Sequence, residues 1–296
     1  MNKEYAIFHI EGGKGKNIAS TGVIKCIKKK YPEKELIVVS PYPEVFINNP
    51  NIYRVFQTTH TPYFYEDYIK GKNTKIFAFD PYNSEDFILQ KKNLIHCWCD
   101  MYNLPYENDF PELFFSYREQ QIALNRFISK KPIMVIQTHG GTVNQAYPIS
   151  WSRDLPLNIA RDVVNHFCKD YEILHIKRED QLAIENATPI TLEDSRLLFL
   201  LIALSEKRLF IDSFAQHAAA ALRKPSTVCW VSNNYNVFGY PIHHNITPEI
   251  GTNFVHHPTS YLYSCDWTGS NASECNYTLE NLYNPENIIK SLETQP

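Results

Sequence analysis

"YAIFHIEGGKGKNIASTGVIKCIKKKYPEKELIVVS", residues 5–40, decides the fold. The stretch predicts an apolar strand at Tyr5–Ile10, a helix from about Ile18 to Lys30, and a second apolar strand at Glu35–Ser40. A strand, a helix and a strand joined by short links form a right-handed parallel unit. The first part of the chain is therefore predicted to be an α/β domain.

The glycine-rich loop before this helix is similar to a phosphate-binding loop but lacks its hydroxyl residue. The Walker A pattern requires Gly-Lys followed by Ser or Thr, whose hydroxyl holds magnesium. Here Gly13-Lys14 is followed by Gly15, and Gly15-Lys16 is followed by Asn17, which excludes that class of nucleotide hydrolase. Glycines before a helix N-terminus still let an anion approach the backbone, so we expect Gly13 and Gly15 to contact a ligand.

Length and composition indicate a two-domain globular protein. The chain has 296 residues, of which 44% are hydrophobic and 21% charged, as is usual for such proteins. The net charge of −3 gives no overall attraction to nucleic acid or to an anionic membrane. We see no signal peptide and no apolar run long enough to span a membrane, so a cytoplasmic location is expected.

The cysteines and histidines do not form a metal-binding pattern. Cys97 and Cys99 are the two cysteines that lie close together, and no second pair completes a zinc site. His243-His244 and His256-His257 have no carboxylate at helical spacing and are interpreted as loop histidines. We therefore expect no metal and no cofactor.

The order of elements predicts two similar halves. The polar segment 116–132 is interpreted as the link between domains. It is followed by strands at 133–138, 171–176, 208–212 and 226–231 and helices at about 156–170 and 192–204, with Thr191 and Asp194 as a capping box. Ligands bind beyond the carboxyl ends of such strands. Asp80, Thr138 and Asp212 are therefore predicted to face a cleft between two doubly wound domains.

"FIDSFAQHAAAALRKP", residues 210–225, is the most specific local pattern. Asp212 ends a strand, Ser213 is predicted to be an N-cap, and His217 follows one turn later on the same helix face. A helix N-terminus, a hydroxyl and an imidazole together predict a cradle for a diphosphate. The alternative is a capped packing helix with a surface histidine.

This stretch, with "STVCWV" and "YNVFGYPIHHNI" after it, resembles the donor-site signature of the heptosyltransferase-like (family 9) glycosyltransferases. "HGG" at 139–141 and "LHIKREDQ" at 174–181 are similar to two further loops of that family, the second of which meets the donor's ribose. The resemblance implies the GT-B fold, in which two Rossmann-like domains face each other across a cleft. It implies an N-terminal acceptor domain (1–122), a C-terminal donor domain (123–284) and a last helix (285–296) that returns to the N-terminal domain in related proteins.

The resemblance and the motifs together predict the site. The donor is expected to contact Gly13, Gly15, His139, Gly140, Arg178, Glu179, Asp212, Ser213, Phe214 and His217.

The chain departs from the family pattern at two positions. Phe214 stands where the family has glycine, and Lys16 stands where it has the catalytic aspartate. Lysine is a poor general base because its ordinary pKa is about 10.4, so Lys16 is predicted to help neutralise the leaving diphosphate. Glu11, or with less support Asp80, is predicted to be the base.

The resulting hypothesis is an inverting, metal-independent glycosyltransferase that uses a nucleotide-sugar donor and a glycan acceptor, as in lipopolysaccharide assembly. The aromatic segment Thr61–Ile69 is suited to stacking on sugars or on bases, so glycosylation of a modified base in DNA is one alternative. Packing of these aromatic side chains within their own loop is the simpler interpretation of the segment. The missing aspartate permits a second alternative, a nucleotide-sugar-binding protein without catalysis.

Overall fold

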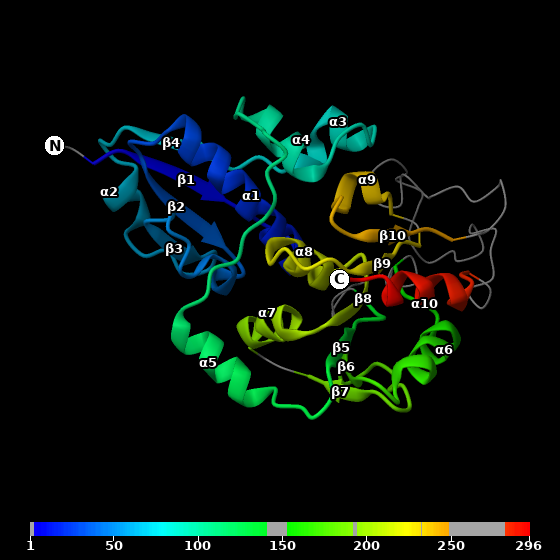
Figure 1. The fold of residues 1–296 in the computed structure, drawn as a ribbon. Helices are drawn as coiled ribbons and strands as arrows, with labels where there is room; N and C mark the ends of the chain where they lie inside the picture. The colour runs from blue at the N-terminus through cyan, green and yellow to red at the C-terminus, as the bar shows by residue number, and fades with distance from the viewer. Residues whose placement is uncertain (1–2, 141–152, 192–193, 232, 249–281) are drawn as a thin grey trace. The chain divides into compact units, whose positions relative to one another are not determined.

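The structure, a computed structural model, describes residues 3–140, 153–191, 194–231, 233–248 and 282–296. The chain divides into two compact units, Met1–Glu119 and Gln120–Pro296, here called unit 1 and unit 2. Each unit is built on its own parallel sheet with helices packed against it (Figure 1). The α/β class predicted from the sequence is therefore confirmed.

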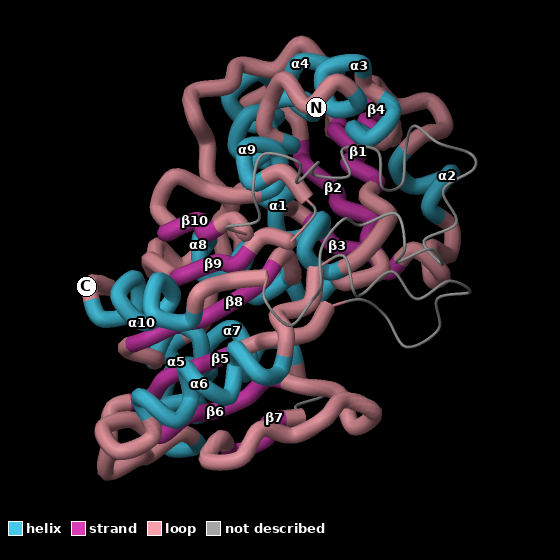
Figure 2. The backbone as a smooth tube through the Cα atoms, turned by 90° about the vertical axis from the view of Figure 1, so that its right-hand side faces the viewer, coloured by secondary structure: helices cyan, strands magenta, loops and turns pink. Residues whose placement is uncertain are grey.

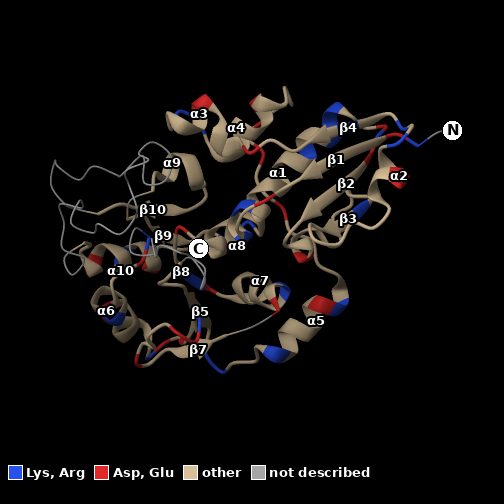
Figure 3. Ribbon diagram, turned by 180° about the vertical axis from the view of Figure 1, so that it is seen from behind, with Lys and Arg blue, Asp and Glu red and all other residues tan. Residues whose placement is uncertain are grey.

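Unit 1 contains a four-stranded parallel sheet in the order β3-β2-β1-β4. The strands are β1 (Tyr5–His9), β2 (Glu35–Ser40), β3 (Arg54–Gln57) and β4 (Thr74–Phe77). The helical segments are α1 (Lys14–Lys30), η1 (Pro43–Phe46), α2 (Phe64–Tyr68), η2 (Pro81–Asn83), α3 (Glu85–Ile88) and α4 (Leu94–Met101). Helix α5 (Tyr117–Arg126) spans the boundary of the two units and carries both basic and acidic residues (Figure 3).

Helix α1 begins earlier than its apolar pattern predicts, at Lys14 instead of about Ile18. Gly13 is the N-cap, with extended backbone (φ −74°, ψ 168°) and no side-chain cap hydrogen bond. The Asn17 side chain donates to the carbonyl oxygen of Gly13 at 3.0 Å, which supports the first turn. Gly15 and Lys16 therefore belong to a helix and not to a flexible loop.

The aromatic segment of unit 1 is partly a packing element. Tyr68, at the end of α2, is buried, and its ring meets Tyr5 edge-on at 5.2 Å and Phe56 at 5.7 Å between centroids. Tyr63 and Tyr65 of the same segment are exposed. One side of the segment thus fills the space beside β1 and β3, while two tyrosines remain accessible.

Unit 2 contains a six-stranded parallel sheet in the order β10-β9-β8-β5-β6-β7 (Figure 2). The strands are β5 (Ile133–Ile136), β6 (Glu172–Ile176), β7 (Thr188–Ile190), β8 (Lys207–Ile211), β9 (Thr227–Cys229) and β10 (His244–Ile246). The strand order runs outward from β5 in one direction and from β8 in the other, which is the doubly wound arrangement. Its topological switch point lies between β5 and β8.

The helices of unit 2 are α6 (Leu157–Phe167), α7 (Ser195–Leu204), α8 (Phe214–Ala221), α9 (Tyr235–Phe238) and α10 (Pro285–Glu293). Helix α7 begins later than predicted, because Asp194 is the N-cap and accepts from the N–H groups of Arg196 and Leu197. Thr191 instead donates its hydroxyl to the carbonyl of Lys177.

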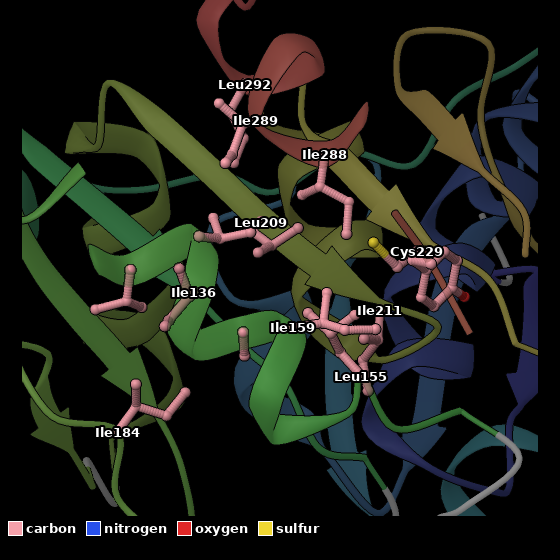
Figure 4. Packing of buried hydrophobic residues seen from close by; sticks show 14 of the residues in the cluster. Ile136, Leu155, Ile159, Ile184, Leu209, Ile211, Cys229, Ile288, Ile289 and Leu292 are labelled. Atoms are coloured by element: carbon pink, nitrogen blue, oxygen red, sulfur yellow. The ribbon is translucent and has the colours of Figure 1, made fainter. Parts of the chain in front are cut away.

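The C-terminal helix is part of the unit 2 core. Ile288, Ile289 and Leu292 of α10 are buried with Leu209 of β8 and Ile159 of α6 (Figure 4). The return of this helix to the N-terminal domain, which the resemblance implies, stays a prediction. Its apolar face is used within unit 2, where burial of side chains of this size stabilises the fold by about 1.5–3 kcal/mol each.

Candidate functional site

A cavity of about 490 Å³ lies at the carboxyl ends of the unit 2 strands. Its walls come from the segments that follow β5, β6 and β8 and from the start of α7 and α8. The lining residues are Gln137, His139, Ile176, Lys177, Arg178, Glu179, Asp180, Gln181, Ile190, Thr191, Leu198, Ser213 and Phe214. This position, at the topological switch point, is where open α/β sheets bind nucleotides.

The segment after β5 is held by side-chain hydrogen bonds. The Gln137 amide donates to the carbonyl oxygen of His139 at 3.2 Å and to the Ser213 hydroxyl at 3.1 Å. Burial lowers the pKa of His139, and the nearby Arg178 lowers it further. His139 is therefore a neutral imidazole on the cavity wall at pH 7.

The loop after β6 brings charge to the cavity. The Arg178 guanidinium donates to Asp180 at 3.0 Å and to the carbonyl oxygen of Gly140 at 3.1 Å. The N–H of Gly140 in turn donates to Asp154 at 2.9 Å. Gly140 thus fixes Arg178 without lining the cavity itself, whereas Glu179 lines it directly. The predicted loops around residues 139 and 178 are brought together.

The start of α8 forms the third wall. Ser213 occupies the N-cap position predicted for it, but its side chain caps no N–H of α8 within the described residues. Its hydroxyl accepts from the Gln137 amide. Phe214 lines the cavity, and its ring lies 6.3 Å from that of Phe199. The aromatic side chain therefore forms part of the cavity wall at the position where the family pattern has glycine.

Two predicted donor-site residues lie away from the cavity wall. His217 is buried, and its Nδ1 is 2.8 Å from the Tyr240 hydroxyl. Burial lowers the pKa of His217 to about 3. Asp212 is also buried and accepts a hydrogen bond from Asn233, and burial raises its pKa. Neither side chain lines the cavity: His217, on α8, contacts Tyr240 in the interior of unit 2, and Asp212, in the link between β8 and α8, is buried against Asn233.

In unit 1, Lys16 and Asp80 form an ion pair. Lys16 Nζ donates to Asp80 Oδ2, and the ammonium lies 4.3 Å from the centroid of the Tyr82 ring and 5.7 Å from that of Trp98. The other oxygen, Asp80 Oδ1, accepts from the Tyr82 N–H at 2.9 Å. Asp80 is thus held in one orientation at the carboxyl end of β4.

The remaining predicted site residues of unit 1, Glu11, Gly13 and Gly15, are close to Lys16 in the sequence. Glu11 is exposed, and its carboxylate lies 3.9 Å from His9 Nε2. Gly12, with φ +93°, packs against the Lys16 stem, whereas a Cβ on Gly13 would have no heavy atom within 4 Å. Gly13 and Gly15 lie at the start of α1.

Several cavity residues were missed by the sequence analysis. Gln137, Lys177 and Gln181 line the cavity. Gln137 lies near the end of the predicted strand 133–138, Lys177 directly follows the predicted strand 171–176, and Gln181 lies in the loop after it. Their positions at strand ends are the same signal that drew attention to Asp80 and Asp212. A neutral glutamine carries no distinctive chemistry in a sequence, so position alone would have had to identify it.

Within the described ranges, three or more His, Cys, Asp or Glu side chains do not come together as a possible metal site. The same residues include no helix with the length and apolarity that crossing a membrane requires.

No protein-family model and no curated protein sequence matches this chain. Solved structures do match it. A family 9 glycosyltransferase from Veillonella parvula is 12% identical, with a TM-score of 0.65, over 99% of this chain and 97% of that one. The E. coli ADP-heptose LPS heptosyltransferase II is 11% identical, with a TM-score of 0.66, over 98% and 97%.

A third match is the iron-containing dodecameric glycosyltransferase TibC from enterotoxigenic E. coli, which is 12% identical, with a TM-score of 0.65, over 99% of this chain and 76% of that one. At these identities the similarity concerns the fold, and it extends over nearly all of this chain in each case. The chain therefore has the GT-B fold of the heptosyltransferase-like family 9 glycosyltransferases.

Proposed function

We propose that this protein is a cytoplasmic glycosyltransferase that moves a sugar from a nucleotide-sugar donor to a hydroxyl group of a glycan. The observation that carries the proposal is the cavity of unit 2, which combines the nucleotide position of a doubly wound sheet with two cationic side chains, Lys177 and Arg178. The GT-B fold supports the assignment. Unit 2 is then the donor unit, and unit 1 is the acceptor unit.

The donor's diphosphate needs stabilisation as it leaves. Lys177 and Arg178 supply positive charge, and the N-terminus of α8, which begins at Phe214, adds the positive end of the helix dipole. These groups perform the task that a divalent cation performs in other transferases, so we propose a metal-independent reaction. Donor binding measured with EDTA and again with added Mg²⁺, with an iron assay of the purified protein, tests this part.

Inversion at the sugar requires a carboxylate that accepts the proton of the acceptor hydroxyl. The geometry of unit 1 favours Asp80 over Glu11 for this role. Asp80 is fixed by Tyr82 and Lys16, whereas Glu11 is largely exposed and has His9 as its neighbour. A fixed carboxylate needs less reorganisation in the transition state. Because Lys16 already pairs with Asp80, its proposed role changes from binding phosphate to orienting the base.

A glycan acceptor of the lipopolysaccharide kind is proposed by analogy with the E. coli heptosyltransferase II. The exposed Tyr63 and Tyr65 are candidates for stacking on its sugar rings. No specific observation favours the alternatives of DNA glycosylation or of a binding protein without catalysis.

The test begins with a panel of nucleotide sugars, including ADP-heptose, and measures thermal stabilisation of the full chain. A stabilising donor is then incubated with glycan acceptors, with DNA and with water alone, and transfer is measured. Transfer to a glycan supports the proposal. A chain that binds a donor and transfers its sugar to none of these is a binding protein, and a chain that binds no donor contradicts the proposal altogether.

Variants of unit 1 identify the base. Asp80→Asn should lower kcat by roughly two to four orders of magnitude and leave donor affinity nearly unchanged, since a general base acts on the acceptor. Glu11→Gln should have a small effect. Glu33→Gln, which removes an exposed carboxylate of the same unit, is the matched control. Full activity of Asp80→Asn would return the role to Glu11.

A further inference from the structure

The hydroxyl of Thr138 connects two imidazole rings in unit 2. Thr138 Oγ1 lies 2.7 Å from Nδ1 of His139 and 2.9 Å from Nε2 of His175. Thr138 and His175 are inaccessible to solvent, with 0% and 1% exposure, whereas His139 lines the cavity. The contacts form a chain from the interior of the sheet to the wall of the proposed donor site.

Both rings are neutral at pH 7. Burial, with smaller effects of His139 and Lys177, lowers the pKa of His175 to about 4. Burial also lowers the pKa of His139, where Arg178 and Lys177 act in the same direction and Asp180 opposes them. A neutral imidazole has one N–H and one bare nitrogen. The single proton of the Thr138 hydroxyl can therefore be donated to one ring only, and the other ring must donate to the hydroxyl oxygen.

Two arrangements of the protons let Thr138 donate to one ring and accept from the other. In the first, His175 Nε2–H donates to Thr138 and Thr138 donates to His139 Nδ1, so that His139 carries its proton on Nε2. In the second, His139 Nδ1–H donates to Thr138 and Thr138 donates to His175 Nε2, so that the proton of His175 lies on Nδ1. That atom is buried and has no hydrogen-bond partner among the residues that the structure describes. An orphaned buried N–H is rarer than a partly satisfied acceptor, so the first arrangement is favoured.

We propose that Thr138 and His175 are positioning residues that hold His139 in its Nε2–H tautomer, and that this N–H donates to an oxygen of the donor's diphosphate. The proposal rests on the proposed function for its ligand. A diphosphate oxygen carries no proton at neutral pH and needs a donor, which only this tautomer supplies from Nε2. Gln137 holds His139 next to Ser213 at the start of α8, where a phosphate is expected.

The tautomer can be measured without any ligand. Long-range 1H–15N NMR of the histidine side chains distinguishes the protonated from the bare nitrogen, and His139→Gln assigns the signals of His139 by their loss. We expect Nε2–H in the wild type and in Thr138→Ser, which keeps the hydroxyl. Thr138→Val, of nearly the same volume, and His175→Phe should give a mixture. Nδ1–H in the wild type, or an unchanged tautomer in folded Thr138→Val, would overturn the proposal.

Binding then tests the contact with phosphate, with ADP and adenosine as probes. Thr138→Val should lower the affinity for ADP roughly five- to tenfold, as for the loss of one hydrogen bond, and leave the affinity for adenosine unchanged. Thr138→Ser, which keeps the hydroxyl, should have the ADP affinity of the wild type. Equal ADP affinities of Thr138→Val and Thr138→Ser would overturn the proposed contact between His139 and the phosphate. If the wild type binds none of ADP, GDP, UDP and CDP, the proposed function and its phosphate contact both fail, and the NMR result still decides the tautomer.

Discussion

Lys16 is the more deeply buried partner of its ion pair with Asp80: its side chain is 6% exposed, against 37% for Asp80. The ammonium has the rings of Tyr82 and Trp98 as its other neighbours. Among the residues that the structure describes, loss of the carboxylate would leave the buried ammonium with cation–π contacts alone. The ion pair therefore matters for the stability of unit 1 as well as for the proposed chemistry.

Asp80→Ala should lower the free energy of unfolding by about 1–3 kcal/mol, below the range for a fully buried pair because one partner is partly exposed. Asp80→Asn should lower the free energy of unfolding less than Asp80→Ala does, since the amide oxygen of asparagine still accepts from Lys16. The measurement is urea unfolding of Asp80→Ala, Lys16→Met and the double variant, whose cycle isolates the coupling. Additive effects of the two single changes would show that the pair contributes no coupling energy.

Gly12 and Gly13 make a matched pair for testing the loop before α1. Gly12→Ala should destabilise the protein by about 1–2 kcal/mol, because φ is +93° and the new Cβ would lie 3.0 Å from Lys16 Cδ. Gly13→Ser should be neutral or stabilising by a few tenths of a kcal/mol, because it adds a side-chain cap at an unobstructed position with ordinary φ, and glycine is already a tolerated N-cap. Thermal and urea unfolding of both variants check this, and equal effects would contradict it.

The sequence predicts the layout of the sheets well because buried parallel strands are continuous apolar runs. β2 and β8 follow from "ELIVVS" and "RLFID" for this reason. The short strands β7 and β10 were missed. Each has three residues at a sheet edge, and β7 contains Pro189, which an edge strand tolerates but which removes any strand signal.

The candidate site could be predicted by position but not by orientation. The resemblance of two loops to those of the family identified His139 and Arg178, and both line the cavity. Spacing on a helix placed His217 one turn after Ser213, yet nothing in the sequence shows that Tyr240 lies 2.8 Å from it in the interior. The Lys16–Asp80 pair joins the first turn of α1 to the segment after β4, which is far away in the chain. Its geometry therefore depends on sheet order, which the local pattern does not specify.

Three buried histidines should make unit 2 sensitive to acid. Burial lowers the pKa of His217 to about 3 and those of His175 and His243 to about 4, below the ordinary value of about 6.5 in the unfolded chain. The unfolded chain therefore binds more protons, and the free energy of unfolding falls as pH drops from about 6.5 toward 4, by about 1.4 kcal/mol per pH unit for each histidine.

The check is urea unfolding between pH 7 and pH 4. His217→Gln, which keeps a polar group near Tyr240, should reduce the slope by about one proton. His166→Gln, which removes an exposed histidine of α6, is the control variant. A slope in His217→Gln equal to that of the wild type would mean that His217 is not held neutral in the fold.

The charge of Arg178 should matter for the phosphates of the donor and not for its nucleoside. Arg178→Gln removes the guanidinium from the cavity wall, where it is held by Asp180 and the carbonyl of Gly140. Hydrogen bonds to a charged group contribute about 1.5–3 kcal/mol, so ADP affinity should fall roughly 10- to 100-fold, while adenosine affinity stays the same.

Lys290→Gln is the matched control, because it removes an exposed positive charge of α10 that does not line the cavity. Calorimetric titration of both variants at two salt concentrations separates a local contact from a general effect of charge, since the general effect is screened by salt and is shared by both variants. Equal losses in the two variants would mean that net charge attracts the nucleotide. A loss confined to Arg178→Gln that persists at high salt places the diphosphate beside this side chain, at the carboxyl end of β6.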